Sequence, residues 1–231
     1  MKKSNKLIIA GFLLVVFIIT AINVTIYAKY KNGDYTIYHP EDYMEPVSMD
    51  SFPGIRFISV YNIVGGVATF GDTTEVEKGI EKNRMQYSRV GDTLVITGME
   101  KENQRGRYRT AFTFPYNASL SFFNSSLVLK GDNKNNEINI DLHLQKSSAL
   151  FFGIDHPLQF GHVKVFASDS STAKFQGNTQ ISNFEVQLSN SAIDYGEGNF
   201  DQLSIVTDSV SRISLQTKQL LKAKITTTTN Q

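Results

Sequence analysis

Two patterns of hydrophobic positions divide the chain into an apolar N-terminal segment and a longer region of alternating residues. In the first pattern, residues 7–28 carry no charge and are mostly large and aliphatic. A helix of this length is about 33 Å long, close to the thickness of a bilayer's hydrocarbon core. The pattern therefore predicts a transmembrane signal anchor over residues 7–28.

Charges around this segment predict its orientation. Lys2, Lys3 and Lys6 precede the apolar run, and basic residues are retained on the cytoplasmic side of a membrane. Residues 1–6 are therefore expected to form a cytoplasmic tail, with the bulk of the chain outside, in the periplasm or at the cell exterior. A signal peptide cleaved after Ala28 is the alternative, and it exports the same residues.

The remaining chain is predicted to be an extended stalk followed by β-structure. Residues 29–52 contain Pro40, Pro46 and few aliphatic side chains, which favours an extended stalk. Residues 53–231 alternate apolar and polar side chains in short runs that end in Gly, Asn, Asp or Ser. This period of two predicts an all-β domain. One helical turn within residues 75–87 and a helix at 217–224 are the exceptions considered, although residues 222–225 fit a strand equally well.

The second half of this domain repeats. One apolar position recurs at intervals of 23, 21, 19 and 20 residues, and Ser-rich corners such as Ser147-Ser148 and Ser170-Ser171 follow the alternating runs. A repeat of about 20 residues with short strands is typical of a parallel β-helix, or β-solenoid, in which stacked coils share one core. An antiparallel sandwich is the alternative. The recurring positions are Leu142, Val165, Val186, Ile205 and Ile225.

Composition narrows the range of functions. The 231 residues have a net charge of +1 and contain no Cys, which excludes disulfides, thiolate metal sites and a Cys nucleophile. A balanced charge without a basic stripe argues against nucleic-acid binding. We predict no metal, no cofactor and no catalytic residue. The four histidines, His39, His143, His156 and His162, are scattered along the sequence.

Recurring carboxylates suggest one enzymatic alternative. Stacked acidic residues could act as the acid and base of a glycoside-cleaving enzyme. Most of them adjoin Ser, Asn or Gly, which instead favours a structural role in turns. The residues are Asp141, Asp155, Asp169, Asp194, Asp201 and Asp208.

Two groups of residues are candidates for an interaction surface. Neighbouring side chains on a strand point in opposite directions, so one member of each pair Phe122-Phe123 and Phe151-Phe152 should face outward. We select Phe123 and Phe152. The basic segment with Arg105, Arg107 and Arg109 favours a solvated hairpin loop, or else a contact with an acidic glycan.

The chain also resembles the bacterial auto-transporter adhesin head domain, or GIN domain. The resemblance covers residues 55–225 and rests on the strands 57–60 and 71–76, the segment 90–96 (Val-Gly-Asp-Thr-Leu-Val-Ile) and the segment 112–121 with its proline. It implies a right-handed parallel β-helix of unknown biochemical role. The chain departs from the family in its anchor and its Phe-rich middle.

These observations together predict a non-enzymatic module of the cell envelope. The anchored solenoid is expected to bind an envelope protein, a glycan, a surface polymer or a second copy of itself. The alternatives are the carbohydrate-active enzyme and a membrane assembly or signalling subunit. Support for the last is weak, because Gly11 has no partner in a Gly-x-x-x-Gly motif.

Overall fold

The computed structural model describes residues 3–32, 48–78, 85–98, 110–131 and 138–228. The chain divides into two compact units, Met1–Pro46 and Val47–Gln231. Within the predicted stalk, residues 33–47 lie outside the described part.

The first unit contains helix α1 (Lys3–Lys31), which includes the whole predicted segment 7–28. Residues Ile9–Lys29 are long and apolar enough to cross a membrane. The polar side chains of this stretch bond to backbone carbonyls four residues earlier, so their hydrogen bonds are satisfied within the helix. These donors are Thr20, Asn23 and Thr25.

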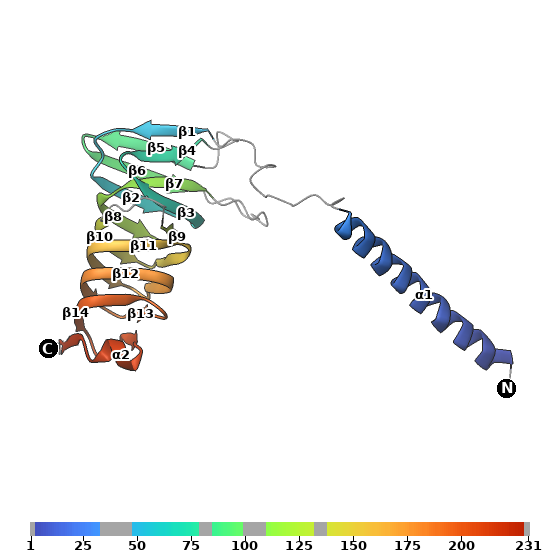
Figure 1. Ribbon diagram of the computed structural model, residues 1–231. Helices are drawn as coiled ribbons and strands as arrows, with labels where there is room; N and C mark the ends of the chain where they lie inside the picture. The colour runs from blue at the N-terminus through green and yellow to red at the C-terminus, as the bar shows by residue number, and fades with distance from the viewer. Residues whose placement is uncertain (1–2, 33–47, 79–84, 99–109, 132–137, 229–231) are drawn as a thin grey trace. The chain divides into compact units, whose positions relative to one another are not determined.

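The second unit is a β-solenoid of about five turns, which confirms the predicted all-β fold (Figure 1). Its elements are β1 (Met49–Phe52), β2 (Phe57–Tyr61), β3 (Val64–Gly71), β4 (Thr74–Glu77), β5 (Met85–Val90), β6 (Thr93–Gly98), β7 (Ala111–Pro115), β8 (Asn117–Phe123), β9 (Ser126–Lys130), β10 (Ile138–Gln145), β11 (Ser148–Ser168), β12 (Thr172–Leu188), β13 (Ala192–Asp194), β14 (Asn199–Thr207), β15 (Arg212–Ser214), α2 (Thr217–Leu220) and β16 (Ala223–Thr227).

The coils have two sides, which we call A and B. Side A stacks β5, β6, β2, β8, β10, the second halves of β11 and β12, then β14 and β16. Side B stacks β1, β4, β7, β3, β9, the first halves of β11 and β12, then β13 and β15. Apart from the antiparallel β1, β4 and β5, these pairings are parallel.

Apolar ladders inside side A confirm the predicted repeat. Leu142, Val165, Val186, Ile205 and Ile225 pair in that order. The ladder continues in the other direction through Leu120 and Ile58 to Leu94. Seven of these eight side chains are buried and Ile225, in the last strand, is 42% exposed. Stacked coils therefore share one core, as the spacing predicted.

Coil order differs from chain order at the N-terminal end. Strand β2 lies between β6 and β8, and β3 lies between β7 and β9. The first coil formed by the chain is therefore an inner coil, and the second covers it. The sheet also starts before Pro53, because Met49–Phe52 of the predicted stalk pairs with β4 as strand β1.

Hydrogen-bonded serines close the corners between side A and side B. The hydroxyl of Ser147 accepts the backbone N–H of Ser125 at 3.1 Å, and that of Ser171 accepts the N–H of Ser147 at 3.1 Å. Asn124 and Lys146 precede these serines with positive φ, a conformation that Asn tolerates well. The corners thus contain a ladder of buried serines, whereas their neighbours Ser148 and Ser170 are half-buried and exposed, respectively.

The predicted short strands are partly wrong. Strands β11 and β12 each continue through the bend between sides B and A, at Gly153 and its paired neighbour Gly177. A Cβ atom on Gly153 would lie 2.5 Å from the carbonyl oxygen of Asn178, so this close approach requires glycine. For residues 217–225 the sequence left a helix and a strand as alternatives. Both are present in succession, a helix at Thr217–Leu220 and a strand at Ala223–Thr227.

Candidate binding groove

Alternation of the paired phenylalanines is confirmed. Phe122 and Phe151 are fully buried, whereas Phe123 and Phe152 are half-buried on the outer surface. Phe123 ends β8 on side A, and Phe152 lies in the first half of β11 on side B. These two residues therefore occupy different sides rather than one surface. The candidate residues Arg105, Arg107 and Arg109 lie outside the described residues.

The outer surface of side A contains a groove of about 340 Å³ across β8, β10, β11 and β12. This volume is at the low end of the range for small-molecule sites. The lining residues are Ser119, Ser121, Phe123, His143, Leu144, Gln145, Phe166, Ala167, Ser168, Gln187 and Ser189. We call this the side-A groove.

Two stacked ring pairs shape the side-A groove. Phe123 stacks on Tyr61 with ring centroids 4.6 Å apart and planes 8° apart. His143 stacks on Phe166 with centroids 4.6 Å apart and planes 14° apart. Both pairs follow directly from the parallel register, because Tyr61 pairs with Phe123 and His143 pairs with Phe166 on neighbouring strands.

Small side chains create the hollow between these rings. Ser121 is the ladder neighbour of His143, and Ser168 continues the ladder of Phe123 and Gln145. A ring beside a serine leaves open space that a second ring would have filled. The groove thus lies where two outer ladders change from aromatic to smaller polar side chains.

The lining combines apolar and polar groups and has no acidic or basic side chain other than the imidazole of His143. Its polar groups are hydroxyls, amides and one imidazole, and none of the lining residues is Asp, Glu, Lys or Arg. Charges lie next to the groove, in the ladder Asp141–Lys164–Glu185. Within it, Lys164 lies 3.7 Å from the Glu185 carboxylate and 5.1 Å from the Phe166 ring centroid.

Several of the recurring carboxylates have structural partners. Asp208 accepts hydrogen bonds from the hydroxyl of Ser211 and from the backbone N–H of Asn190, and these bonds lower the pKa of its carboxyl. Asp194 accepts from the N–H of Gly196, and Asp169 accepts from the amide of Gln145. These contacts agree with the turn role that the sequence favoured.

The histidines do not converge in the described part of the chain. His143 lies in the groove, whereas the backbone N–H of His162 donates to Asn139 in a neighbouring coil. His39 and the side chain of His156 lie outside the described structure. Among the described residues, no group of three His, Cys, Asp or Glu side chains could hold a metal ion.

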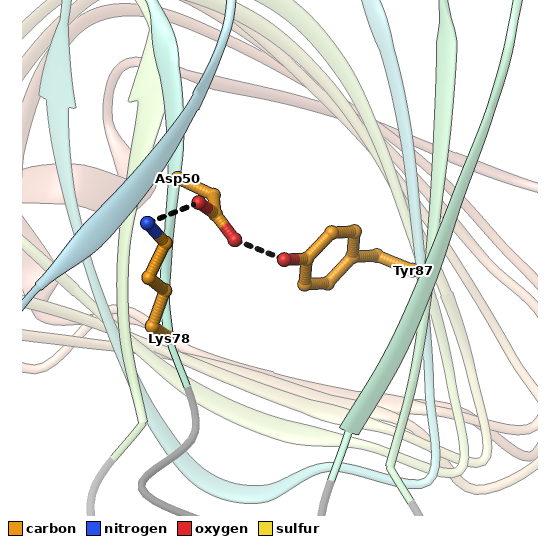
Figure 2. A network of polar contacts seen from close by, with 3 residues as sticks. All are labelled: Asp50, Lys78 and Tyr87. Atoms are coloured by element: carbon orange, nitrogen blue, oxygen red, sulfur yellow. Dashed lines mark hydrogen bonds and ion pairs between the residues drawn. The ribbon is translucent and has the colours of Figure 1, made fainter. Parts of the chain in front are cut away.

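A second polar cluster lies at the N-terminal end of the solenoid (Figure 2). Asp50 of β1 pairs with Lys78 at 2.9 Å and accepts a hydrogen bond from the hydroxyl of Tyr87 in β5. The Tyr87 bond and the Lys78 contact lower the pKa of Asp50. The same carboxylate raises the pKa of Tyr87. The cluster ties β1 on side B to β5 on side A, which indicates a structural clasp.

Comparisons with known proteins add little. No protein-family model matches the chain, and neither does any curated protein. Among solved structures, the chain is similar to one described as "a putative cell adhesion protein from Clostridium sporogenes ATCC 15579". The identity is 10% over 78% of this chain and 98% of that chain, with a TM-score of 0.29. Similarity at this level supports no functional argument, so the resemblance to the adhesin head family stays a prediction.

The sequence singled out Phe123 but missed Phe166, His143 and Tyr61 as its companions. A sequence-level signal did exist, since His143 directly follows Leu142 and Phe166 directly follows Val165, so both face outward. Their stacking depends on which strands become neighbours.

Proposed function

We propose that the chain is a membrane-anchored, non-enzymatic binding module whose side-A groove holds a segment of an extracytoplasmic polymer. The groove itself supports this proposal best. It combines ring surfaces with convergent hydroxyl and amide groups, the combination typical of ligand sites.

Helix α1 supplies the anchor in this proposal. Its apolar length fits a single membrane crossing. With Lys2, Lys3 and Lys6 retained in the cytoplasm, the solenoid would lie outside it. A rigid stack of coils then presents the groove to material outside the membrane.

The chemistry of the lining favours binding over hydrolysis. Glycoside cleavage by the usual route needs two carboxyl groups on either side of the scissile bond. The lining residues of the side-A groove include no carboxylate. The carboxylates of Asp208, Asp194 and Asp169 instead accept structural hydrogen bonds.

Single substitutions in the full-length protein, reconstituted in lipid nanodiscs, test the proposal. Phe123→Ala and Phe166→Ala remove ring surface from the groove, and Phe152→Ala is the matched control because it is a half-buried outer ring on side B. Each variant is applied to arrays of immobilised glycans and peptides. We expect the groove variants to lose about tenfold in affinity relative to the control. Equal binding by all three variants, or no binding by the parent protein, would overturn the proposal.

A further inference from the structure

The groove residues also define the chemical class of the ligand. Resting on the proposed function, we infer that the side-A groove binds an uncharged glycan chain, with one pyranose ring against the Phe123 ring and a neighbouring one against the His143–Phe166 pair. Three observations support this assignment.

The first observation is that no backbone is available for pairing at the groove. Peptides usually bind a sheet by adding a strand to an open edge, where main-chain groups give the affinity. The groove lies on the outer surface of β8, β10, β11 and β12, and each of these strands is paired on both sides there, β8 with β2 and β10, and β12 with β11 and β14. A ligand in the groove therefore finds no open strand edge to pair with.

The second observation is the charge of the lining. Ser119, Ser121 and Ser168 offer hydroxyls that both donate and accept, and Gln187 offers an amide that does the same. The Gln145 amide also lines the groove and donates one hydrogen bond to Asp169. Sugar hydroxyls have this dual character, so such groups match them without an ionic partner. The adjacent Asp141–Lys164–Glu185 ladder has two acidic side chains and one basic side chain, and Asp169 lies against Gln145, so the surroundings do not attract an acidic ligand.

The third observation is the placement of the rings. The C–H face of a pyranose is apolar and weakly positive, and it packs on the negative face of an aromatic ring. Phe123 and Phe166 lie two coils apart along the stack, because β10 separates β8 from the second half of β11. The two rings are also offset by two positions along the strand, so their backbones lie about 12 Å apart. This is about the length of one disaccharide unit, and a chain that contacts both rings would cross the stack obliquely.

Filling the hollow tests the assignment. Ser121→Leu places a bulky apolar side chain beside His143, where a pyranose would lie. Ser59→Leu is the matched control, because Ser59 is the next residue of the same outer ladder yet does not line the groove. The melting temperature of each variant is measured first, and Phe166→Ala replaces Ser121→Leu if the latter fails to fold.

Binding of the full-length protein in nanodiscs is measured by calorimetry with three soluble probes. These are the β-1,4-linked hexamer of N-acetylglucosamine, a hyaluronan hexamer with alternating carboxylates, and a neutral decapeptide rich in Ser and Gly. We expect binding of the uncharged hexamer, weakened about tenfold by Ser121→Leu and less than twofold by Ser59→Leu. We expect no comparable binding of the other two probes.

The outcomes separate the two proposals. Groove-dependent binding of the peptide or of hyaluronan, but not of the uncharged hexamer, would overturn the glycan assignment and leave the groove as a binding site. Binding of the uncharged hexamer that Ser121→Leu leaves unchanged would also overturn the assignment. No groove-dependent binding to these probes or to the arrays would overturn the proposed function as well.

Discussion

The coils stack on one another in different ways at the two ends of the solenoid. From β10 to β16 the coils stack in the order of the chain, and every pairing is parallel. From β1 to β9 the first coil is enclosed by the second, and the antiparallel β1, β4 and β5 lie at the margin. One apolar ladder from Leu94 to Ile225 runs through both halves and is buried as far as Ile205.

This difference teaches that a shared core does not require a visible repeat. A core position needs only a neighbour of similar size above and below it, whichever part of the chain supplies that neighbour. Open parallel edges invite pairing with other chains. The Asp50 clasp links the outermost strands β1 and β5 at one end, whereas β16 leaves Ile225 partly exposed at the other.

The largest effect is expected from a substitution between β10 and β16, where the coils stack in chain order. Val186→Asp puts a carboxylate into the buried ladder between Val165 and Ile205, and should destabilise the protein by more than about 3 kcal/mol. Urea unfolding measures the change. Gln187→Asp adds the same group to the exposed side of the same strand and should change stability by less than about 0.5 kcal/mol. Near-normal stability of Val186→Asp would contradict the shared core.

The next largest effect is expected from a substitution in the ladder of buried corner serines. Ser147→Ala removes the acceptor for the buried N–H of Ser125 and should cost about 1–3 kcal/mol. Ser148→Ala is the control, because its hydroxyl only pairs with half-buried Ser126. If thermal unfolding shows that the two variants lose the same stability, the buried serine ladder does not stabilise the stacking of the coils.

A smaller effect of opposite sign is expected at Tyr195. Its ring continues the core stack of Phe151 and Phe175, but its buried hydroxyl has no hydrogen-bond partner within the described structure. Burial raises the pKa of this hydroxyl well above its ordinary value, so it stays neutral. Tyr195→Phe should therefore keep the stack and gain about 1 kcal/mol in chemical unfolding. A clear loss would reveal a partner for the hydroxyl.

The smallest effect is expected at the N-terminal end of the solenoid, where the contribution of the Asp50 clasp to stability depends on pH. Because the pKa of Asp50 is lowered from 3.8, its contribution is present above pH 3.8 and is lost as the pH falls through the lowered value. Because the pKa of Tyr87 is raised from 10.0, its contribution is present below pH 10.0 and is lost as the pH rises through the raised value.

Amide exchange of β1 as a function of pH measures this clasp. Protection should weaken at both extremes in the parent protein. Tyr87→Phe should remove the loss of protection at alkaline pH and keep the pair of Asp50 with Lys78. Asp50→Asn should remove the loss of protection at both acidic and alkaline pH. Unchanged profiles in both variants would show that the clasp does not hold β1 in place.

The sequence by itself determined the inward phase of the strands. Leu142, Val165, Val186 and Ile205 pair as their spacing predicted, because a one-residue slip would turn every core side chain outward. The same alternation placed Phe122 and Phe151 inside and Phe123 and Phe152 outside. Local patterns of two and of about twenty residues thus specified the coil and its core.

Only the tertiary structure decided which coils became neighbours at the N-terminal end and where the outer surface became hollow. Strand β2 pairs with β8, more than fifty residues further along, and that contact stacks Tyr61 on Phe123. The groove then arises because Ser121 lies beside His143 on adjacent coils. Outer positions lack the burial energy that specifies the core, so their partners follow from the stack and cannot be inferred from local spacing.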